Sequence, residues 1–212
     1  AKAGATKVYA TEIDPAMIRI AQDNINRNGL QRKITVLNKD TRDVKISDLD
    51  FEKVDVAIAE HLSTWQVMEP QISVFNHINA ALIKHDGIRI PESIDNCVEL
   101  AQSIYQFDGG IDLRTHYYEF SGVQKPRPLS SKQVFSVIDI AQENPTTSQG
   151  VVLVSVVDDG VLNSLRLTSP IKVRDGIHFD ASDSLMPPVV VPLDNDMSVA
   201  KGDTVELRIQ YD

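Results

Sequence analysis

Two glutamates lie at the two ends of a short polar and apolar segment. Glu60 and Glu69 enclose the residues His61-Leu62-Ser63-Thr64-Trp65-Gln66-Val67-Met68, directly after a mostly apolar stretch over residues 54–59. Two carboxylates that converge would grip a guanidinium group through paired charge-assisted hydrogen bonds and would fix its plane. They would also draw positive charge away from a reacting nitrogen. Two ordinary surface glutamates explain the same spacing, and spacing alone favours that simpler interpretation.

Polar side chains also follow two strand-like stretches nearer the N-terminus. Glu12 follows residues 7–11, and in nucleotide-binding α/β folds an acidic residue at the end of the second strand accepts hydrogen bonds from ribose hydroxyls. Asp40 and Thr41 follow residues 33–37, where the same folds place groups that contact adenine. Asp40 could accept a hydrogen bond from the exocyclic amine. From position alone, a solvated carboxylate for Glu12 and an Asx turn or helix cap for Asp40 are equally well supported.

A helix is predicted between these two strand-like stretches. Asp14 suits the N-cap and Pro15 the first helical position, while Ile18, Ala21 and Ile25 recur on one helical face. Asn28-Gly29 would end the helix, because both residues tolerate the left-handed conformation of a C-terminal cap.

The remaining stretches up to about residue 93 continue the alternation. The apolar run over residues 54–59 predicts a buried parallel strand, and residues 72–82 predict a helix that ends near His85-Asp86-Gly87. Another strand is predicted to start at residues 88–91. Strand, helix, strand, strand and helix in this order indicate a parallel α/β sheet.

From about residue 94 the pattern changes to β-type runs separated by turn-rich pieces. The runs cover residues 133–140, 150–157, 189–192 and 204–211. They predict an antiparallel barrel or sandwich, and the less regular residues 106–132 could form an arm. The fold class is therefore α/β + β, with a partial Rossmann-like sheet over residues 1–93 and an antiparallel β-barrel-like domain over residues 94–212.

Composition and charge narrow the classes of function. The chain has 30 acidic and 21 basic residues, and its formal net charge of −9 argues against a nonspecific nucleic-acid binder and mildly suits a cationic substrate. No apolar run has the length of a membrane span, and the N-terminus has no signal-peptide apolar region, so we expect a cytoplasmic protein without a membrane partner. The single cysteine, Cys97, is interpreted as a small buried hydrophobe, and five scattered histidines predict no metal site.

Several segments together resemble the protein arginine methyltransferase family of class I S-adenosylmethionine-dependent methyltransferases. Residues 1–12 are similar to the end of that family's first helix and its second strand, and Glu60 and Glu69 match its double-glutamate loop. Gly87-Ile88-Arg89-Ile90-Pro91 is similar to the element that leads out of its methyltransferase domain. Residues 189–211 resemble the closing strands of its barrel.

The resemblance implies a cofactor, an acceptor and a reaction. S-adenosylmethionine would be the cofactor, with Glu12 as the ribose ligand and with Asp40 and Thr41 near adenine. Glu60 and Glu69 would be the catalytic pair that holds a guanidinium nitrogen for methyl transfer. Positioning would supply most of the catalysis, and either glutamate could receive the proton that the nitrogen loses.

The chain also departs from the family pattern at three places. The family's first strand and glycine-rich loop would precede Ala1, so we expect the chain as it stands to bind S-adenosylmethionine weakly or not at all. His61-Leu62-Ser63-Thr64 stands where the family has Trp-Met-Gly-Tyr, and Ser184-Leu185-Met186 stands where it has Thr-His-Trp. These differences leave arginine specificity open. A methyltransferase with another protein or small-molecule acceptor and a noncatalytic binding or scaffold protein are the alternatives.

Other residues carry weaker predictions. Residues 106–132 occupy the place of the family's dimerisation arm, so a homodimer is expected. His61 could carry a proton, although a merely polar loop histidine is the more usual case. Trp65 and Met68 could line a substrate channel, but apolar residues in a short loop more often anchor it to the core.

Overall fold

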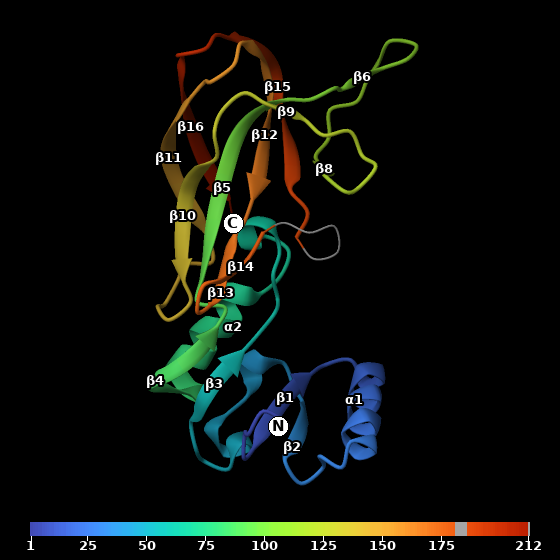
Figure 1. The fold of residues 1–212 in the computed structure, drawn as a ribbon, viewed down its shortest axis with the longest axis vertical. Helices are drawn as coiled ribbons and strands as arrows, with labels where there is room; N and C mark the ends of the chain where they lie inside the picture. The colour runs from blue at the N-terminus through green and yellow to red at the C-terminus, as the bar shows by residue number, and fades with distance from the viewer. Residues whose placement is uncertain (181–185, 212) are drawn as a thin grey trace. The chain divides into compact units, whose positions relative to one another are not determined.

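The chain folds into two compact units. The computed structural model describes residues 1–180 and 186–211, and Figure 1 draws their fold. The first unit consists of Ala1–Ala57 with Ser73–Ile88, and the second of Ile58–Ile72 with Arg89–Asp212. In the described ranges, no helix is long and apolar enough to cross a membrane.

A parallel βαβ arrangement opens the first unit. β1 (Val8–Glu12) and β2 (Ile34–Asn38) pair in parallel, and α1 (Pro15–Arg27) connects them. The predicted helix start is confirmed, because the Asp14 carboxylate caps α1 by accepting a 2.7 Å hydrogen bond from the amide of Ala16. Glu12 pairs with Asn38 in the ladder, so the segments that follow the two strands leave the same edge of this sheet.

β3 (Val54–Ile58) and β4 (Ile83–Ile90) form a separate two-stranded sheet. Within the described residues, no strand ladder joins this pair to β1 and β2. The prediction of a buried strand over residues 54–59 is therefore wrong for most of its side chains, since Val56 is 45% exposed and Ile58 is 72% exposed. Of the β3 residues Ala57 alone is buried, because a strand with one partner is covered less completely than a central strand.

The helix predicted over residues 72–82 is present but ends earlier than expected. α2 (Gln71–His77) continues into the π-helical segment η4 (Ile78–Leu82), and β4 begins immediately at Ile83. The sequence-based end near His85-Asp86-Gly87 is wrong. Ile83 has extended backbone angles (φ −102°, ψ 149°) and is only 1% exposed, so burial of this side chain coincides with the change from helix to strand.

Antiparallel strands build the second unit, as predicted. The main sheet has the order β14-β13-β5-β12-β15-β8, with β10 and β9 also paired with β5, while β11 pairs with β16. Figure 1 shows these strands curling around a common core. The strands, with two more in the arm, are β5 (Ser93–Gln102), β6 (Gln106–Phe107), β7 (Ile111–Asp112), β8 (Tyr117–Tyr118), β9 (Arg127–Pro128), β10 (Gln133–Asp139), β11 (Ser148–Ser155), β12 (Gly160–Thr168), β13 (Ile171–Arg174), β14 (Ile177–Phe179), β15 (Val189–Val199) and β16 (Thr204–Tyr211).

Between β5 and β9 the chain forms an arm that returns to the barrel at β8, which pairs with β15. β6 and β7 form a small hairpin in which Phe107 pairs with Ile111, and Figure 1 shows it projecting from the curled sheet. Both side chains are exposed, by 54% and 55%. Arg114 attaches the arm to β15, because its guanidinium donates to the carbonyl of Leu193 at 3.1 Å and to Asp196 at 2.7 Å.

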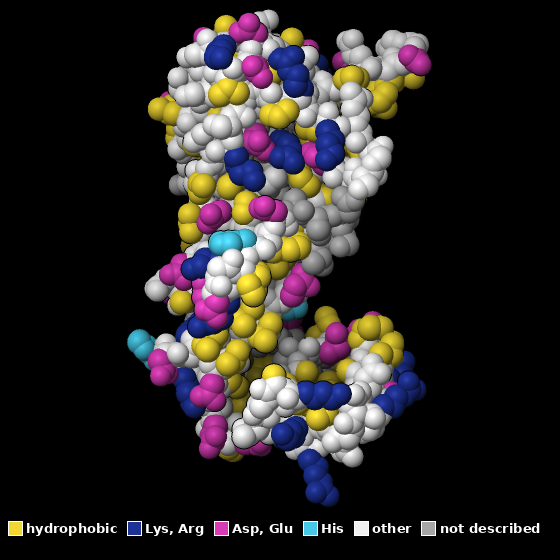
Figure 2. All heavy atoms as spheres, viewed as in Figure 1, with side chains coloured by type: hydrophobic (Ala, Val, Ile, Leu, Met, Phe, Trp, Pro, Cys, Tyr) yellow, Lys and Arg dark blue, Asp and Glu magenta, His cyan; other side chains and the backbone are white. Residues whose placement is uncertain are grey.

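A cluster of charged side chains joins β5, β12 and the base of the arm. Arg166 donates to Glu99 at 2.5 Å and to Glu119 at 2.6 Å, and Lys125 lies 3.6 Å from Glu119. Burial alone would lower the pKa of Arg166, but its hydrogen bonds with Glu119 and Glu99 raise that pKa above its ordinary value. Figure 2 shows acidic and basic side chains interleaved on a face of this unit.

Candidate functional site

The Glu12 carboxylate is fixed through one of its two oxygen atoms. Its Oε1 accepts hydrogen bonds from the backbone amides of Ile13 at 2.7 Å and Asp14 at 2.9 Å. The described residues offer no hydrogen-bond partner to Oε2. Glu12 is half-buried, so this arrangement leaves one oriented oxygen atom at the end of β1. Such an atom can accept hydrogen bonds from a ligand's hydroxyl groups.

Thr41 lies next to the end of β1, as the shared strand edge predicts. Its Oγ1 is 2.7 Å from the Oγ1 of Thr11, and this hydrogen bond ties β1 to the 3₁₀ turn η1 (Thr41–Asp43). The contact brings the segment after β2 beside the residue that precedes Glu12. Three of the predicted positions, at residues 12, 40 and 41, therefore lie near one edge of the first unit.

Asp40 adopts the capping role that its sequence position left open. The carboxylate accepts a hydrogen bond from the Arg42 amide at 2.8 Å and thereby caps η1. It also receives the guanidinium of the same arginine, with Nε at 2.9 Å and Nη2 at 2.6 Å. The hydrogen bonds with Asp40 raise the pKa of Arg42 above its ordinary value. An adenine contact by Asp40 stays a prediction, and it requires the carboxylate to be shared with Arg42.

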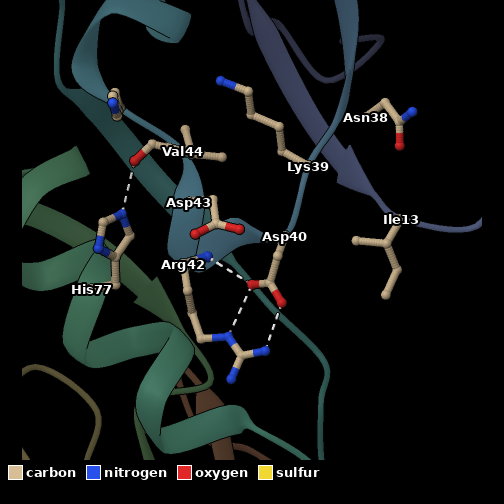
Figure 3. A pocket seen from close by; sticks show the side chains of 9 residues that line it. Ile13, Asn38, Lys39, Asp40, Arg42, Asp43, Val44 and His77 are labelled. Atoms are coloured by element: carbon tan, nitrogen blue, oxygen red, sulfur yellow. Dashed lines mark hydrogen bonds and ion pairs between the residues drawn. The ribbon is translucent and has the colours of Figure 1, made fainter.

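A cavity of about 760 Å³ opens beside these residues. It lies between the end of β2, η1 and α2, and Figure 3 shows its side chains from close by. This volume falls within the range of small-molecule sites. His77 is fixed at its rim, because its Nε2 donates to the carbonyl of Val44 at 2.8 Å. The lining residues are Ile13, Asn38, Lys39, Asp40, Arg42, Asp43, Val44, Lys45 and His77.

The loop from Glu60 to Glu69 belongs to the second unit. Both glutamates are exposed, and they stand at the two ends of the loop as the sequence predicts. The Oε1 of Glu60 accepts one long hydrogen bond, 3.4 Å from the amide of Leu62. For the Glu69 carboxylate, the described residues provide no hydrogen-bond or ion-pair partner. Both carboxylates therefore have acceptor atoms available to a ligand.

Two buried polar side chains fix the backbone at the ends of this loop. The Gln71 side chain accepts from the amide of His61 at 2.8 Å and donates to the carbonyl of Ala59 at 3.0 Å. The Ser63 hydroxyl accepts from the amides of Met68 at 3.1 Å and Glu69 at 3.3 Å. The Gln71 side chain is completely buried, so water does not compete for its amide group in the bonds with His61 and Ala59. The sequence contains no signal that would have singled out these two residues.

Trp65 anchors the middle of the loop in the barrel core, which confirms the anchoring interpretation for this residue. It is 3% exposed and stacks on Phe135, with ring centroids 5.1 Å apart and planes 9° apart. Met68 is 71% exposed and does not anchor the loop. Of the segment that aligns with the family's Thr-His-Trp, Ser184 and Leu185 lie outside the described residues, and Met186 is buried.

The interpretation of Cys97 as a small buried hydrophobe is also confirmed. Its side chain is free of disulfides and only 2% exposed, and burial raises the pKa of the thiol to about 11. The thiol is therefore protonated at neutral pH and is a poor nucleophile. In the part of the chain that the structure describes, no three His, Cys, Asp or Glu side chains are grouped so as to hold a metal ion.

Comparisons with known proteins first define a class. The model of the family "Ribosomal protein L11 methyltransferase (PrmA)" matches residues 1–90. The fold matches two solved arginine methyltransferases over 98% of the chain. They are the Trypanosoma brucei PRMT1 enzyme-prozyme heterotetramer with AdoHcy (TM-score 0.79, 15% identity, 72% of that chain) and Arabidopsis thaliana protein arginine methyltransferase 10 (0.80, 18%, 73%). The chain thus has the fold of a two-domain methyltransferase.

Several proteins are also similar to this chain in sequence. An uncharacterised protein of Methanocaldococcus jannaschii is 28% identical over 98% of this chain and 73% of its own length. The arginine N(omega)-methyltransferase of Streptomyces achromogenes subsp. streptozoticus is 26% identical over 100% of this chain and 64% of its own length. Protein arginine N-methyltransferase 7 of Drosophila persimilis is 35% identical, but over only 48% of this chain and 15% of its own length. The chain is therefore similar in sequence to arginine methyltransferases, over its whole length in one case and over 48% of it in another, and its first 90 residues match the model of a methyltransferase family.

Proposed function

We propose that the protein transfers a methyl group from S-adenosylmethionine to a guanidinium nitrogen held by Glu60 and Glu69. One observation carries this proposal: two exposed carboxylates stand at the ends of a loop whose intervening backbone is fixed by Gln71, Ser63 and Trp65. A fixed loop backbone limits the entropy that the two acceptors lose when they bind a planar cation. The similarity to arginine methyltransferases supports the same acceptor.

The residues of the first unit fit the proposed cofactor. Oε2 of Glu12 offers an acceptor to the ribose hydroxyls, and Ile13, which is 66% exposed and lines the cavity, offers an apolar surface to adenine. Thr41 and Asp40 would lie near the adenine ring. When bound, S-adenosylmethionine supplies a methyl group activated by its positively charged sulfur. The arginine methyltransferase of Trypanosoma brucei was solved with AdoHcy, which supports this choice of cofactor.

In the proposed mechanism the two glutamates orient the acceptor and remove its proton. Their negative charges favour the guanidinium cation and localise its positive charge on the nitrogens that they contact. The guanidinium nitrogen that the carboxylates leave uncontacted would accept the methyl group that S-adenosylmethionine would supply. The methylated nitrogen then loses one proton, which a carboxylate oxygen of Glu60 or Glu69 can accept.

Free arginine and arginine within a peptide share the guanidinium chemistry, so the assay needs both. Labelled methyl transfer should be measured with L-arginine, with an arginine-containing peptide and with the same peptide carrying lysine. We expect transfer to one or both arginine acceptors and none to lysine. Glu60→Gln and Glu69→Gln are each expected to lower kcat/KM about 10- to 100-fold, because a hydrogen bond to a charged group contributes about 1.5–3 kcal/mol.

Glu143→Gln is the matched control, because it removes an exposed glutamate outside this loop. Activity on arginine that survives both loop substitutions would rule out the glutamate pair. Activity on another acceptor alone would favour the alternative of a methyltransferase that acts on a different protein side chain or on a small molecule. Absence of both transfer and cofactor binding would leave a noncatalytic protein that retains the fold.

Cofactor binding has its own test, because the sequence predicts weak binding by this chain. S-adenosylmethionine should be titrated calorimetrically into the 212-residue chain. Weak or absent binding would agree with that prediction, and tight binding would contradict it. We also propose that the protein forms a homodimer through the arm. A cytoplasmic location stays a prediction.

A further inference from the structure

Trp65 is held by the barrel at three points besides its stacking on Phe135. Its backbone amide donates to the hydroxyl of Ser169 at 2.7 Å, and its indole Nε1 donates to the carbonyl of Cys97 at 3.0 Å. Its ring also contacts that of Tyr211 at a centroid distance of 5.5 Å. The side chain belongs to the hydrophobic core of the barrel. A residue in the middle of the loop is thus a fixed part of the second unit.

The backbone around this anchor is strained. Trp65 has φ of 60° and Gln66 has φ of 58°, so two consecutive residues with large side chains occupy the left-handed region. Each such residue is unfavourable and persists only where surrounding contacts determine its conformation. The contacts of Trp65 with the barrel are among those that do so here, together with two hydrogen bonds from Gln66 to the carbonyl of Ser63, at 3.0 Å from its amide and 2.7 Å from its Nε2. The loop conformation therefore depends on them.

A chain of buried and partly buried hydrogen bonds continues from Trp65 into the strands. Ser169, which accepts from the Trp65 amide, donates to Asn96 Oδ1 at 2.9 Å. The Asn96 amide group donates in turn to Tyr211 at 3.2 Å and to Ser136 at 3.3 Å. Ser169 is 1% exposed and Asn96 is completely buried. This relay connects the loop to β5, β10 and β16 with every member paired.

We propose that Ser169 and Asn96 are positioning residues for the acceptor site, acting through Trp65 on the loop that carries Glu60 and Glu69. The inference rests on the proposed function of the two glutamates. The connection to Glu69 is short, because Ser63, two residues before Trp65, binds the Glu69 amide. The barrel thereby sets where the acceptor carboxylates stand. Cofactor binding by the first unit does not depend on this relay.

Ser169→Ala tests the relay, and Ser164→Ala is its matched control. Both serines are buried and lie on or just after β12, and each makes two side-chain hydrogen bonds. The hydrogen bonds of the Ser164 side chain go to Tyr105 and Asn163, which are not loop residues. Both variants should lower Tm by a similar amount, since each leaves buried polar groups without a partner. Ser169→Ala alone should raise KM for the arginine acceptor, by roughly 10- to 100-fold, because the strained turn is released.

Two further measurements separate positioning from stability. The Kd for S-adenosylmethionine should be equal in wild type, Ser169→Ala and Ser164→Ala. Amide hydrogen exchange of residues 60–69 should be faster in Ser169→Ala than in wild type and unchanged in Ser164→Ala. Trp65→Phe, which keeps an aromatic ring but removes the bond to Cys97, should produce an intermediate rise in KM.

The possible outcomes distinguish this inference from the proposed function. Equal KM values and equal exchange in the two serine variants, with wild-type methyl transfer intact, would overturn the positioning role alone. A wild-type protein that neither methylates nor binds arginine acceptors would overturn the proposed function and the positioning role with it. A selective rise in acceptor KM with unchanged cofactor Kd supports both.

Discussion

Glu12 has different surroundings at its two carboxylate oxygens, and this difference predicts the effect of a single substitution. Glutamine at this position keeps an oxygen for the amides of Ile13 and Asp14 but replaces the other oxygen with an NH₂ group. Loss of a charged acceptor for the ribose hydroxyls costs about 1.5–3 kcal/mol. Glu12→Gln should therefore raise the Kd for S-adenosylmethionine about 10- to 100-fold in calorimetric titration.

The fold should tolerate this change, because the hydrogen bonds at the start of α1 are kept. Tm of Glu12→Gln should therefore match that of wild type. Glu143→Gln again provides the control for removing one exposed negative charge. Unchanged cofactor affinity in Glu12→Gln would exclude binding of ribose by Glu12. The carboxylate would then serve only to accept hydrogen bonds from the amides of Ile13 and Asp14.

The sequence predicted the positions of site residues that stand at the end of a strand or loop and whose carboxylate has no competing side-chain partner. Glu12, Glu60 and Glu69 lie where strand ends and loop ends were expected, although their roles stay predictions. Asp40 was not decidable, because its capping bond and its ion pair with Arg42 use the same carboxylate that a ligand would need. Gln71 could not have been found, since its partners are backbone atoms that the fold brings to it.

Among the elements, β5 and β12 depend on the charged cluster around Arg166. The side chains of Glu99 and Glu119 are only 12% and 5% exposed, and Arg166 is their main cation. Arg166→Met would leave two nearly buried carboxylates without this partner. The expected loss in the free energy of unfolding is about 3 kcal/mol, at the lower end for a broken buried ion pair because Arg166 keeps some contact with solvent. Urea unfolding followed by the fluorescence of Trp65 measures it.

Neutralising the carboxylates separates the charge effect from the packing effect. Arg166→Met combined with Glu99→Gln and Glu119→Gln should recover part of the loss, because no buried charge then lacks a partner. Trp65 is the chain's single tryptophan and lies in the barrel core, so its signal reports on the second unit. A change below about 0.5 kcal/mol for Arg166→Met would mean that the cluster behaves as an ordinary surface ion pair.

The strands that the sequence revealed differ physically from those that it hid. β16 alternates inward residues such as Val205 and Leu207 with exposed ones such as Glu206, so the two-residue period predicted Thr204–Tyr211 to the residue. β5 and β12 lie inside the sheet and contain buried polar residues such as Asn96 and Ser164. Asn96 is hydrogen-bonded to side chains of β10 and β16, and Ser164 to Tyr105 and Asn163, and the first of these pairings is one that no local pattern records. The fold class was therefore predictable, while the central strands of the barrel were not.

At the scale of the whole molecule, the arm exposes apolar side chains that a second copy would cover. Phe107 and Ile111 face solvent on the projecting hairpin, and Leu113 is 59% exposed beside them. Arg114 fixes the base of the arm, so these side chains are presented on an anchored segment. Large exposed apolar groups that gather on one segment are typical of a protein interface. We expect wild type to sediment as a dimer and Phe107→Asp/Ile111→Asp to sediment as a monomer.

Val151→Asp/Leu153→Asp is the control, because these side chains are 61% and 62% exposed on β11, outside the arm, and their replacement introduces the same two charges. This variant should remain dimeric, since the expected contact is made by the arm and not by the outer face of the barrel. The Tm of the arm variant should fall only by the amount that dimerisation contributes to the Tm of wild type. Because the variant is a monomer, its Tm should no longer depend on protein concentration. A wild type that stays monomeric at high concentration, or an arm variant that stays dimeric, would exclude this hairpin as the dimer contact.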